Sequence, residues 1–225
     1  MKKSEKRISL GAGVLTAPVP PVMVTVGDME KSNIITIGWT GILATKPPKT
    51  YISVRPERYS YKILKESGEF VINLASKSLA YETDFAGIYS GKNVDKFDKL
   101  GLTKYPSEKV ACPTIAECPV SIECRVSEVI PMGTHDVFVA DILAVSCREE
   151  IVDGEGRADF ALADLLAYAH GEYFALGERL GKIGFSTDKK KEEKKAEPFY
   201  RAVAKQAKKA PSKNKDKGKP KRRNK

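Results

Sequence analysis

Residues 33–61 read NIITIGWTGILATKPPKTYISVRPERYSY, and this stretch decides the fold of the chain. Its segments NIITIG and TYISVR are rich in β-branched residues and have the length of strands. The segment between them, GILATKPPK, contains two prolines, which are excluded from central strands and predict an extended turn. A helix is predicted to follow over 60–67, with Ser60 as its N-cap and Gly68 as its C-cap.

Cationic and polar side chains collect where this helix is predicted to begin. They are Arg55, Arg58, Tyr59 and Ser60. The free N–H groups and the dipole of a helix N-terminus favour an anion, and guanidinium groups add paired donors that match phosphate. Trp39 is expected to end the preceding strand, and an aromatic surface near a phosphate site suits a nucleotide-like ligand. The alternatives are a solvated surface charge for Arg58 and an ordinary core aromatic for Trp39.

Later segments, taken in order along the chain, resemble a known family. They are EFVINLAS at 69–76, SGKNVDKF at 90–97, SIECRV at 121–126 and GTHDVFVADI at 133–142. Together with residues 33–61, these segments resemble the flavin reductase-like family of FMN-binding split-barrel proteins, which includes the flavoredoxin group. The resemblance covers about residues 17–185. It implies a mainly β fold, namely an FMN-binding split β-barrel of Greek-key antiparallel strands with peripheral helices.

FMN has a phosphate, a ribityl chain and a flat ring, and the chain offers candidate residues for each part. The phosphate is assigned to the helix start, with Arg55, Arg58, Tyr59 and Ser60. The ring and the ribityl chain are assigned to Thr36, Gly38, Trp39 and Thr40. Gly38 has no side chain and so allows close approach between the backbone and the ligand. The end of the second strand adds Ser53 and Val54.

The resemblance adds a loop of further candidates. Family members approach the flavin across a dimer interface with the loop that corresponds to Ser90, Gly91 and Lys92. Either Lys92 or Lys96 would place a positive charge near the reduced flavin and tune its electronics. For each lysine taken alone, an ordinary loop lysine is the favoured alternative.

Two more candidates lie further along the chain. His135 corresponds to a position in the family's GDH-like turn, although this chain has Thr134 where aspartate is frequent. An ordinary hairpin histidine is the alternative. Tyr173 is a candidate to cover the ring. No catalytic side chain and no metal ligands are predicted, because hydride transfer to flavin N5 needs positioning and exclusion of water more than an acid or a base.

The resemblance implies a flavin-dependent oxidoreductase that transfers electrons through FMN. It would act as an NAD(P)H:flavin reductase-like enzyme, with NAD(P)H as a transient electron donor, or as a flavoredoxin-like electron carrier. A homodimer with FMN at the interface is expected, and the redox partner or small-molecule acceptor stays open. Two alternatives stay open as well: a protein that holds FMN without turnover, and a protein tethered to nucleic acid by its basic tail.

Charge is distributed unevenly along the chain. The net charge is +10, and residues 188–225 alone carry +12, which leaves −2 for residues 1–187. We expect a basic N-terminal arm over 1–16, a flavin reductase-like FMN-binding split-barrel domain over 17–187 and a disordered Lys-rich tail over 188–225. The tail suits either solubilisation or nonspecific electrostatic contact with nucleic acid.

The cysteines and the apolar runs indicate a reduced, cytoplasmic protein without a membrane segment. Cys124 and Cys147 lie in apolar strand patterns and are expected to be buried thiols. Cys112 and Cys118 each precede a proline in a loop, where we expect exposure, with a redox disulfide between them as a minor alternative. The chain has no signal-peptide pattern and no apolar run of membrane-spanning length.

The rest of the chain is predicted to be strand-rich. Strands are expected at 22–26, 70–74, 120–130 and 136–147, with a hairpin turn around Gly133. Helices are expected from Ser78 through about residue 86 and over 160–168, the latter ending near Gly171. The region 88–119 is predicted to be mostly loop.

Overall fold

The computed structural model describes residues 6–187 of the protein. Residue contacts divide the chain into two parts after Arg179. The tail predicted over 188–225 lies outside the described residues, as do residues 1–5 of the predicted N-terminal arm. The predicted domain limits of 17–187 stay a prediction. No helix in the described part is long and apolar enough to cross a bilayer.

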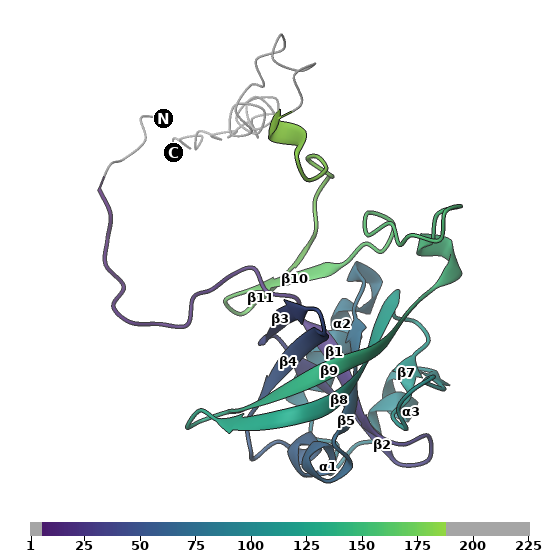
Figure 1. Ribbon diagram of the computed structural model, residues 1–225. Helices are drawn as coiled ribbons and strands as arrows, with labels where there is room; N and C mark the ends of the chain where they lie inside the picture. The colour runs from purple at the N-terminus through teal and green to yellow at the C-terminus, as the bar shows by residue number, and fades with distance from the viewer. Residues whose placement is uncertain (1–5, 188–225) are drawn as a thin grey trace, which may run out of the picture. The chain divides into compact units, whose positions relative to one another are not determined.

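An antiparallel sheet of seven strands forms the centre of the first part, among the residues that the structure describes (Figure 1). Its strands are β1 (Val22–Gly27), β2 (Ser32–Ile37), β3 (Thr40–Thr45), β4 (Pro48–Val54), β5 (Glu69–Leu74), β8 (Val120–Pro131) and β9 (Asp136–Cys147). They lie in the order β2–β1–β5–β8–β9–β4–β3, and every neighbouring pair is antiparallel. This arrangement confirms the predicted antiparallel, mainly β fold.

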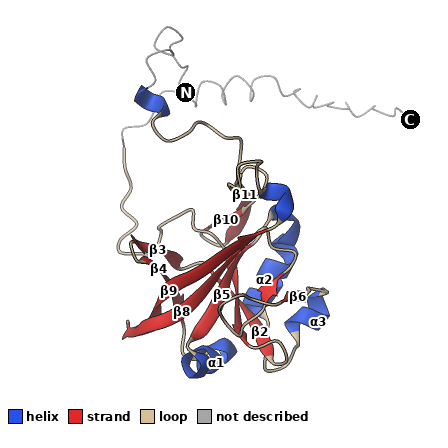
Figure 2. Ribbon diagram, turned by 45° about the vertical axis from the view of Figure 1, so that its right-hand side comes forward, coloured by secondary structure: helices blue, strands red, loops and turns tan. Residues whose placement is uncertain are grey.

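Shorter elements accompany this sheet (Figure 2). Two-stranded sheets join β6 (Lys104–Tyr105) to β7 (Thr114–Ile115) and β10 (Leu166–Ala169) to β11 (Glu172–Ala175). The α-helices of the described part are α1 (Tyr59–Ser67), α2 (Ala80–Ile88) and α3 (Lys96–Leu100). Single 3₁₀ turns occur at Lys77–Leu79, Glu149–Ile151 and, in the part that follows Arg179, at Phe185–Thr187. In both ribbon views α1 lies at one end of the large sheet.

The large sheet curls so that its two edges approach each other. β2 and β3 occupy opposite edges, yet Gly38 and Trp39 alone join Ile37 at the end of β2 to Thr40 at the start of β3. A link of this length spans at most roughly 10 Å. The backbone N–H of Ser53 in β4 donates to the carbonyl oxygen of Trp39 at 2.9 Å and holds the link on that side. The sheet is therefore a barrel that is split between β2 and the β3–β4 hairpin.

Hydrophobic side chains pack on both faces of β1. Alternate valines of β1 join Phe70 and Phe138 in a buried cluster inside the barrel. Met23, on the other face of β1, joins a second cluster with Ala86 of α2 and Phe97 of α3. Because each face of β1 has its own cluster, this strand is buried on both sides and α2 is held against the sheet.

The predicted extended turn over GILATKPPK is wrong, because most of this segment forms the strands of the β3–β4 hairpin. Pro47 lies in the turn, and Pro48 is the first residue of β4. Within residues 6–187, β3 is an edge strand whose one neighbour in the sheet is β4. Proline is compatible with sheets at such positions, where no ladder hydrogen bond is lost.

Ser60 is not the N-cap of α1, contrary to the prediction. The helix begins at Tyr59, and Arg58 is the N-cap residue, with no side-chain capping bond. Ser60 is buried in the first turn, and its Oγ accepts a hydrogen bond from Asn33 Nδ2 at 2.7 Å. The predicted C-cap is confirmed, since Gly68 has a φ of +66° and its N–H donates to the Leu64 carbonyl at 2.9 Å.

The helix predicted over 160–168 is also wrong, because residues 166–175 form the β10–β11 hairpin. His170 and Gly171 both have positive φ angles, 49° and 96°, which fits a two-residue hairpin turn. The backbone N–H and carbonyl of Tyr168 exchange hydrogen bonds with Val19, at 2.8 and 2.9 Å. A partner about 150 residues away in sequence therefore overrides the local helical pattern.

Two smaller predictions need adjustment around α2 and α3. Ser78 lies inside a 3₁₀ turn that precedes α2, and its Oγ bonds to Ser76 Oγ at 2.8 Å instead of capping the helix. The region predicted as loop contains α3, whose N-cap Asp95 accepts hydrogen bonds from the backbone N–H groups of Phe97 and Asp98. A carboxylate in this position satisfies donors that the first turn leaves free.

Cys112 and Cys118 are buried, so the expected exposure is wrong. Burial raises the pKa of Cys112 to about 12, and it raises the pKa of Cys118 even further above its usual range. Cys124 is buried as predicted, whereas Cys147 is partly exposed, contrary to the prediction. A thiol that is both shielded and protonated reacts slowly, because the thiolate is the nucleophile.

Thiol labelling at pH 8 is therefore expected to modify Cys147 first in the native protein. The three buried thiols should react only after unfolding in guanidinium chloride, where all four cysteines become accessible. Mass spectrometry of peptides after a short pulse of iodoacetamide would measure the order. Fast native labelling of Cys112 or Cys118 would contradict the burial described above.

Candidate functional site

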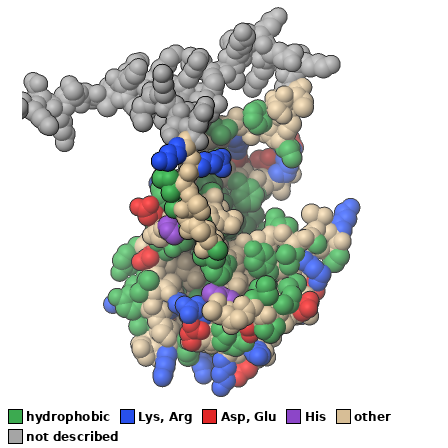
Figure 3. Space-filling model, turned by 90° about the vertical axis from the view of Figure 1, so that its left-hand side faces the viewer, with side chains coloured by type: hydrophobic (Ala, Val, Ile, Leu, Met, Phe, Trp, Pro, Cys, Tyr) green, Lys and Arg blue, Asp and Glu red, His purple; other side chains and the backbone are tan. Residues whose placement is uncertain are grey.

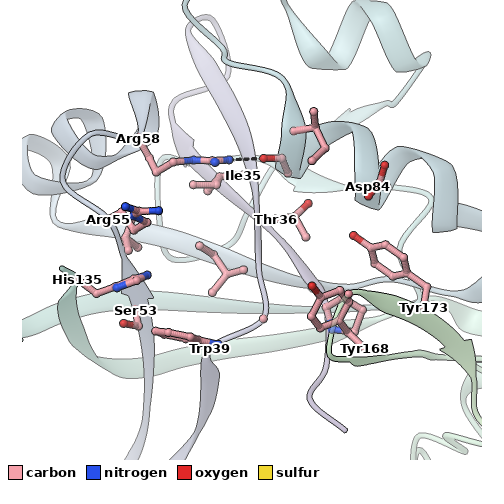
Figure 4. A pocket seen from close by; sticks show the side chains of 17 residues that line it. Ile35, Thr36, Trp39, Ser53, Arg55, Arg58, Asp84, His135, Tyr168 and Tyr173 are labelled. Atoms are coloured by element: carbon pink, nitrogen blue, oxygen red, sulfur yellow. Dashed lines mark hydrogen bonds between the residues drawn. The ribbon is translucent and has the colours of Figure 1, made fainter. Parts of the chain in front are cut away.

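A cavity of about 430 Å³ opens at the split of the barrel (Figure 4). Its walls come from β2, the Gly38–Trp39 link, the end of β4, α2 and the β10–β11 hairpin. A volume of this size falls in the range of pockets that hold cofactors. Thr36 Oγ1 donates to the carbonyl oxygen of Thr83 at 2.5 Å and so joins the β2 wall to the α2 wall.

One end of the cavity is cationic. Figure 4 shows Arg55, Arg58 and His135 on the same side of it. The Arg58 guanidinium donates to the carbonyl oxygen of Gly87 in α2, and Arg55 Nε pairs with Glu57 Oε1 at 2.7 Å. Each guanidinium has further N–H donors, and two such groups at a helix start can bind an anion.

Trp39 forms a flat wall next to this cationic end. Its side chain is 44% exposed, which excludes the alternative of an ordinary core aromatic. The ring lies against His135, with centroids 4.6 Å apart and planes at 34°. Burial, followed by the charge of Arg55, lowers the pKa of His135, so the imidazole is predominantly neutral at pH 7.

The opposite end of the cavity carries Asp84, Tyr168 and Tyr173 (Figure 4). The two tyrosine rings meet edge to face, with centroids 5.3 Å apart. Burial, followed by the negative charge of the nearby Asp84 carboxylate, raises the pKa of Tyr173 to about 12. The phenol therefore keeps its proton throughout the neutral range.

The structure brings most of the predicted residues together. The cavity is lined by nine of them, namely Thr36, Gly38, Trp39, Ser53, Val54, Arg55, Arg58, His135 and Tyr173. An adjacent pocket of about 110 Å³ also includes Arg58 and adds Tyr59, Ser60, Ser90 and Gly91. Lys92 lines a neighbouring hollow that shares Gly91 with this pocket. None of these cavities is lined by Thr40, whose Oγ1 donates to the carbonyl oxygen of Tyr51 inside the β3–β4 hairpin.

Sequence reasoning missed Asp84, Gly87 and Tyr168. A hairpin turn at His170–Gly171 would have revealed Tyr168, because it places this residue directly opposite Tyr173. No local pattern marks Asp84 or Gly87, which reach the cavity only because α2 packs against β2.

Comparisons with known proteins agree with this geometry. The family model described as "Flavin reductase like domain" matches residues 15–177. The structure is similar to flavoredoxin of Desulfovibrio vulgaris (Miyazaki F), with a TM-score of 0.76, 35% identity and coverage of 81% of this chain and 100% of that one. It is also similar to flavoredoxin from Methanosarcina acetivorans, with a TM-score of 0.75, 25% identity and coverage of 81% and 98%. An uncharacterized protein of Archaeoglobus fulgidus is 35% identical over 130 residues, which cover 58% of this chain and 73% of that protein.

The family match contains the whole large sheet, the split and every residue that lines the larger cavity. Together with the flavoredoxin neighbours, it supports a role in flavin-related electron transfer. The protein belongs to the flavin reductase-like family.

Proposed function

We propose that the protein binds FMN in the larger cavity and transfers electrons through it as a flavin-dependent oxidoreductase. The observation that carries this proposal is the pairing, within one cavity, of a cationic end with the exposed flat face of Trp39. The cationic end suits the phosphate of FMN, and the flat face of Trp39 suits its isoalloxazine ring. FMN, when bound, would supply the hydride and electron-transfer chemistry.

The residues of the chain would bind and orient this cofactor. Arg58 and Arg55 would hold the phosphate, and Trp39 would pack against the ring. The phenol of Tyr173 stays protonated and so would present an uncharged ring and hydroxyl group at the far end of the cavity. The wall formed by α2 and the β10–β11 hairpin would limit access of water to the ring.

NAD(P)H is proposed as a transient electron donor. Hydride transfer to the flavin needs the two rings to be stacked in the correct orientation, and it needs little acid–base chemistry from the protein. The uncharged His135 imidazole packs against Trp39 in the lining of the cavity, and its ring offers a surface on which a second aromatic ring could pack. A flavoredoxin-like carrier, which passes electrons to a protein partner, would use the same cavity without a nicotinamide.

A homodimer is proposed as the working form. Ile88 and Tyr89, at the end of α2 beside the cavities, are 71% and 50% exposed. The face drawn in Figure 3 likewise exposes hydrophobic side chains (green) among charged ones. Burial of such side chains by a second copy is favourable, and it would close the open side of the site.

An absorption spectrum of the purified, desalted protein tests this function directly. Flavin bands that survive desalting are expected, and anaerobic addition of NADH or NADPH is expected to bleach them. Light scattering of the same sample measures whether the protein is a dimer. Bound flavin that no nicotinamide reduces would favour a flavoredoxin-like carrier or a protein that only holds FMN. A colourless protein that binds no added FMN would overturn the proposal.

A further inference from the structure

Two cationic side chains satisfy the last carbonyl groups of α2. A helix leaves its final carbonyls without partners inside the helix. Here Phe85 O accepts from the backbone N–H of Tyr89 at 3.0 Å, and Ala86 O accepts from Lys96 Nζ at 2.7 Å. The next carbonyl, Gly87 O, accepts from the Arg58 guanidinium. Positive charge at this end also complements the helix dipole.

Lys96 joins this helix end to the sheet. Its Nζ donates a second hydrogen bond, at 2.6 Å, to the carbonyl oxygen of Ile34 in β2. The residue is only 3% exposed and is the first residue of α3. The ammonium group therefore bridges α2 and β2. These elements form two walls of the larger cavity, which Gly87 lines from α2 and Thr36 lines from β2.

The two walls fit closely where the ammonium bridges them. A Cβ atom at Gly87 would lie 3.2 Å from Thr36 Cβ, which is tighter than most contacts of this kind. A small movement of the last turn of α2 would therefore change both the width of the cavity and the position of the Gly87 carbonyl. Arg58 is bonded to that carbonyl, so its guanidinium would move with it.

The ammonium group of Lys96 lies near another cation, Arg58. The charged and titratable groups that share its pocket are Glu57, Arg58, Tyr59 and Tyr89. Glu57 pairs with Arg55, which leaves Arg58 as the charge that acts on the ammonium group. Burial first, and then Arg58, lower the pKa of Lys96 to about 8.

We infer that Lys96 is a positioning residue, which fixes the last turn of α2 against β2 and thereby places Arg58 and the Gly87 wall at the anion-binding end of the cavity. Its effect on cofactor affinity rests on the proposed function, whereas its effect on α2 does not.

An anion bound at this end of the cavity stabilises the charged form of Lys96 and raises its pKa. Above pH 8 the free protein must then take up a proton in order to bind, so FMN affinity should fall as the pH rises from 7.5 to 9.5.

Hydrogen exchange of the protein without added cofactor tests the structural part. Lys96→Met is expected to speed exchange at the amides of residues 86–89 at least several-fold, because their helix end loses its anchor. Lys99→Met, on the exposed side of the same short helix α3, is the matched control and should leave these amides unchanged. Unchanged exchange in Lys96→Met would overturn the inference, whatever the cofactor does.

Titration with FMN tests the link to the site. Lys96→Met is expected to weaken binding at least tenfold at pH 7.5 and to lose the fall in affinity at high pH, whereas Lys96→Arg should recover part of the affinity. Faster exchange with unchanged FMN affinity would overturn the positioning role. If Lys96→Met does not fold, the FMN affinity of the wild-type protein is measured between pH 7.5 and 9.5 instead. An affinity that does not change over this range would overturn the inference. A wild-type protein that binds no FMN would instead overturn the proposed function. The hydrogen-exchange result would then test by itself whether Lys96 fixes the last turn of α2.

Discussion

An Arg58→Ala variant is expected to bind FMN roughly ten- to a hundredfold more weakly than the wild-type protein. A hydrogen bond to a charged group contributes about 1.5–3 kcal/mol, and each 1.4 kcal/mol corresponds to about a factor of ten in affinity. Arg58 stands at the N-cap of α1 and at the cationic end of the cavity, so its loss removes the donor and the charge together. The Gly87 carbonyl also loses its partner, which should lower the free energy of unfolding modestly.

The measurement is fluorescence quenching of FMN at fixed ionic strength, with three proteins compared. Lys62→Ala is the matched control, because Lys62 is a solvent-exposed cation on the same helix and pairs with Glu66 on the surface. Arg58→Lys keeps the charge but loses the planar donor pair, so intermediate affinity is expected. Wild-type affinity in Arg58→Ala would refute the assigned role in phosphate binding.

A Phe138→Ala variant is expected to lose about 3–5 kcal/mol of its free energy of unfolding. Phe138 lies on β9, is fully buried in the cluster inside the barrel, and pairs in register with Ile52 of β4. Its ring meets that of Tyr61 edge to face, with centroids 5.5 Å apart, so the side chain also supports α1. Truncation therefore leaves a cavity where strand and helix meet.

Urea unfolding, followed by circular dichroism, measures this loss. Val145→Ala on the same strand is the matched control, because Val145 is 58% exposed and its truncation should change stability by less than about 0.5 kcal/mol. Phe138→Leu should recover a large part of the stability, since it fills most of the space. A loss below about 1 kcal/mol in Phe138→Ala would mean that the barrel interior relaxes around the gap.

The strands and the cationic group were predictable because their signals are local. β-branched runs gave β8 and β9, and Gly68 marked the end of α1. Arg55 and Arg58 lie on one short connection between a strand and a helix, so their proximity follows from sequence spacing alone. Trp39 was also identified, although its exposure became evident only from the structure.

The errors have a common physical origin in contacts between distant segments. Ser60 has the right chemistry for an N-cap, but Asn33 uses its hydroxyl group. The residues around Tyr168 have a helical pattern, but pairing with Val19 makes them a strand. Cys112 looked exposed beside a proline, yet the fold covers it completely. For Ser60 and Tyr168, a partner that lies far away in the sequence supplied an interaction stronger than the local preference, and for Cys112 the packing of the fold decided the burial.

The two-residue link between β2 and β3 has a consequence for how ligand preference can change in this protein. Gly38 and Trp39 connect the two edges of the sheet beside the opening of the cavity. The length of this link therefore limits the distance between the two strand ends at that point. Core substitutions can lower the fraction of folded molecules, but in those that fold the two-residue link still limits the distance between the ends of β2 and β3. Ligand preference can therefore change through lining side chains such as His135 and Tyr173, while the spacing of the two strand ends at the link stays constant.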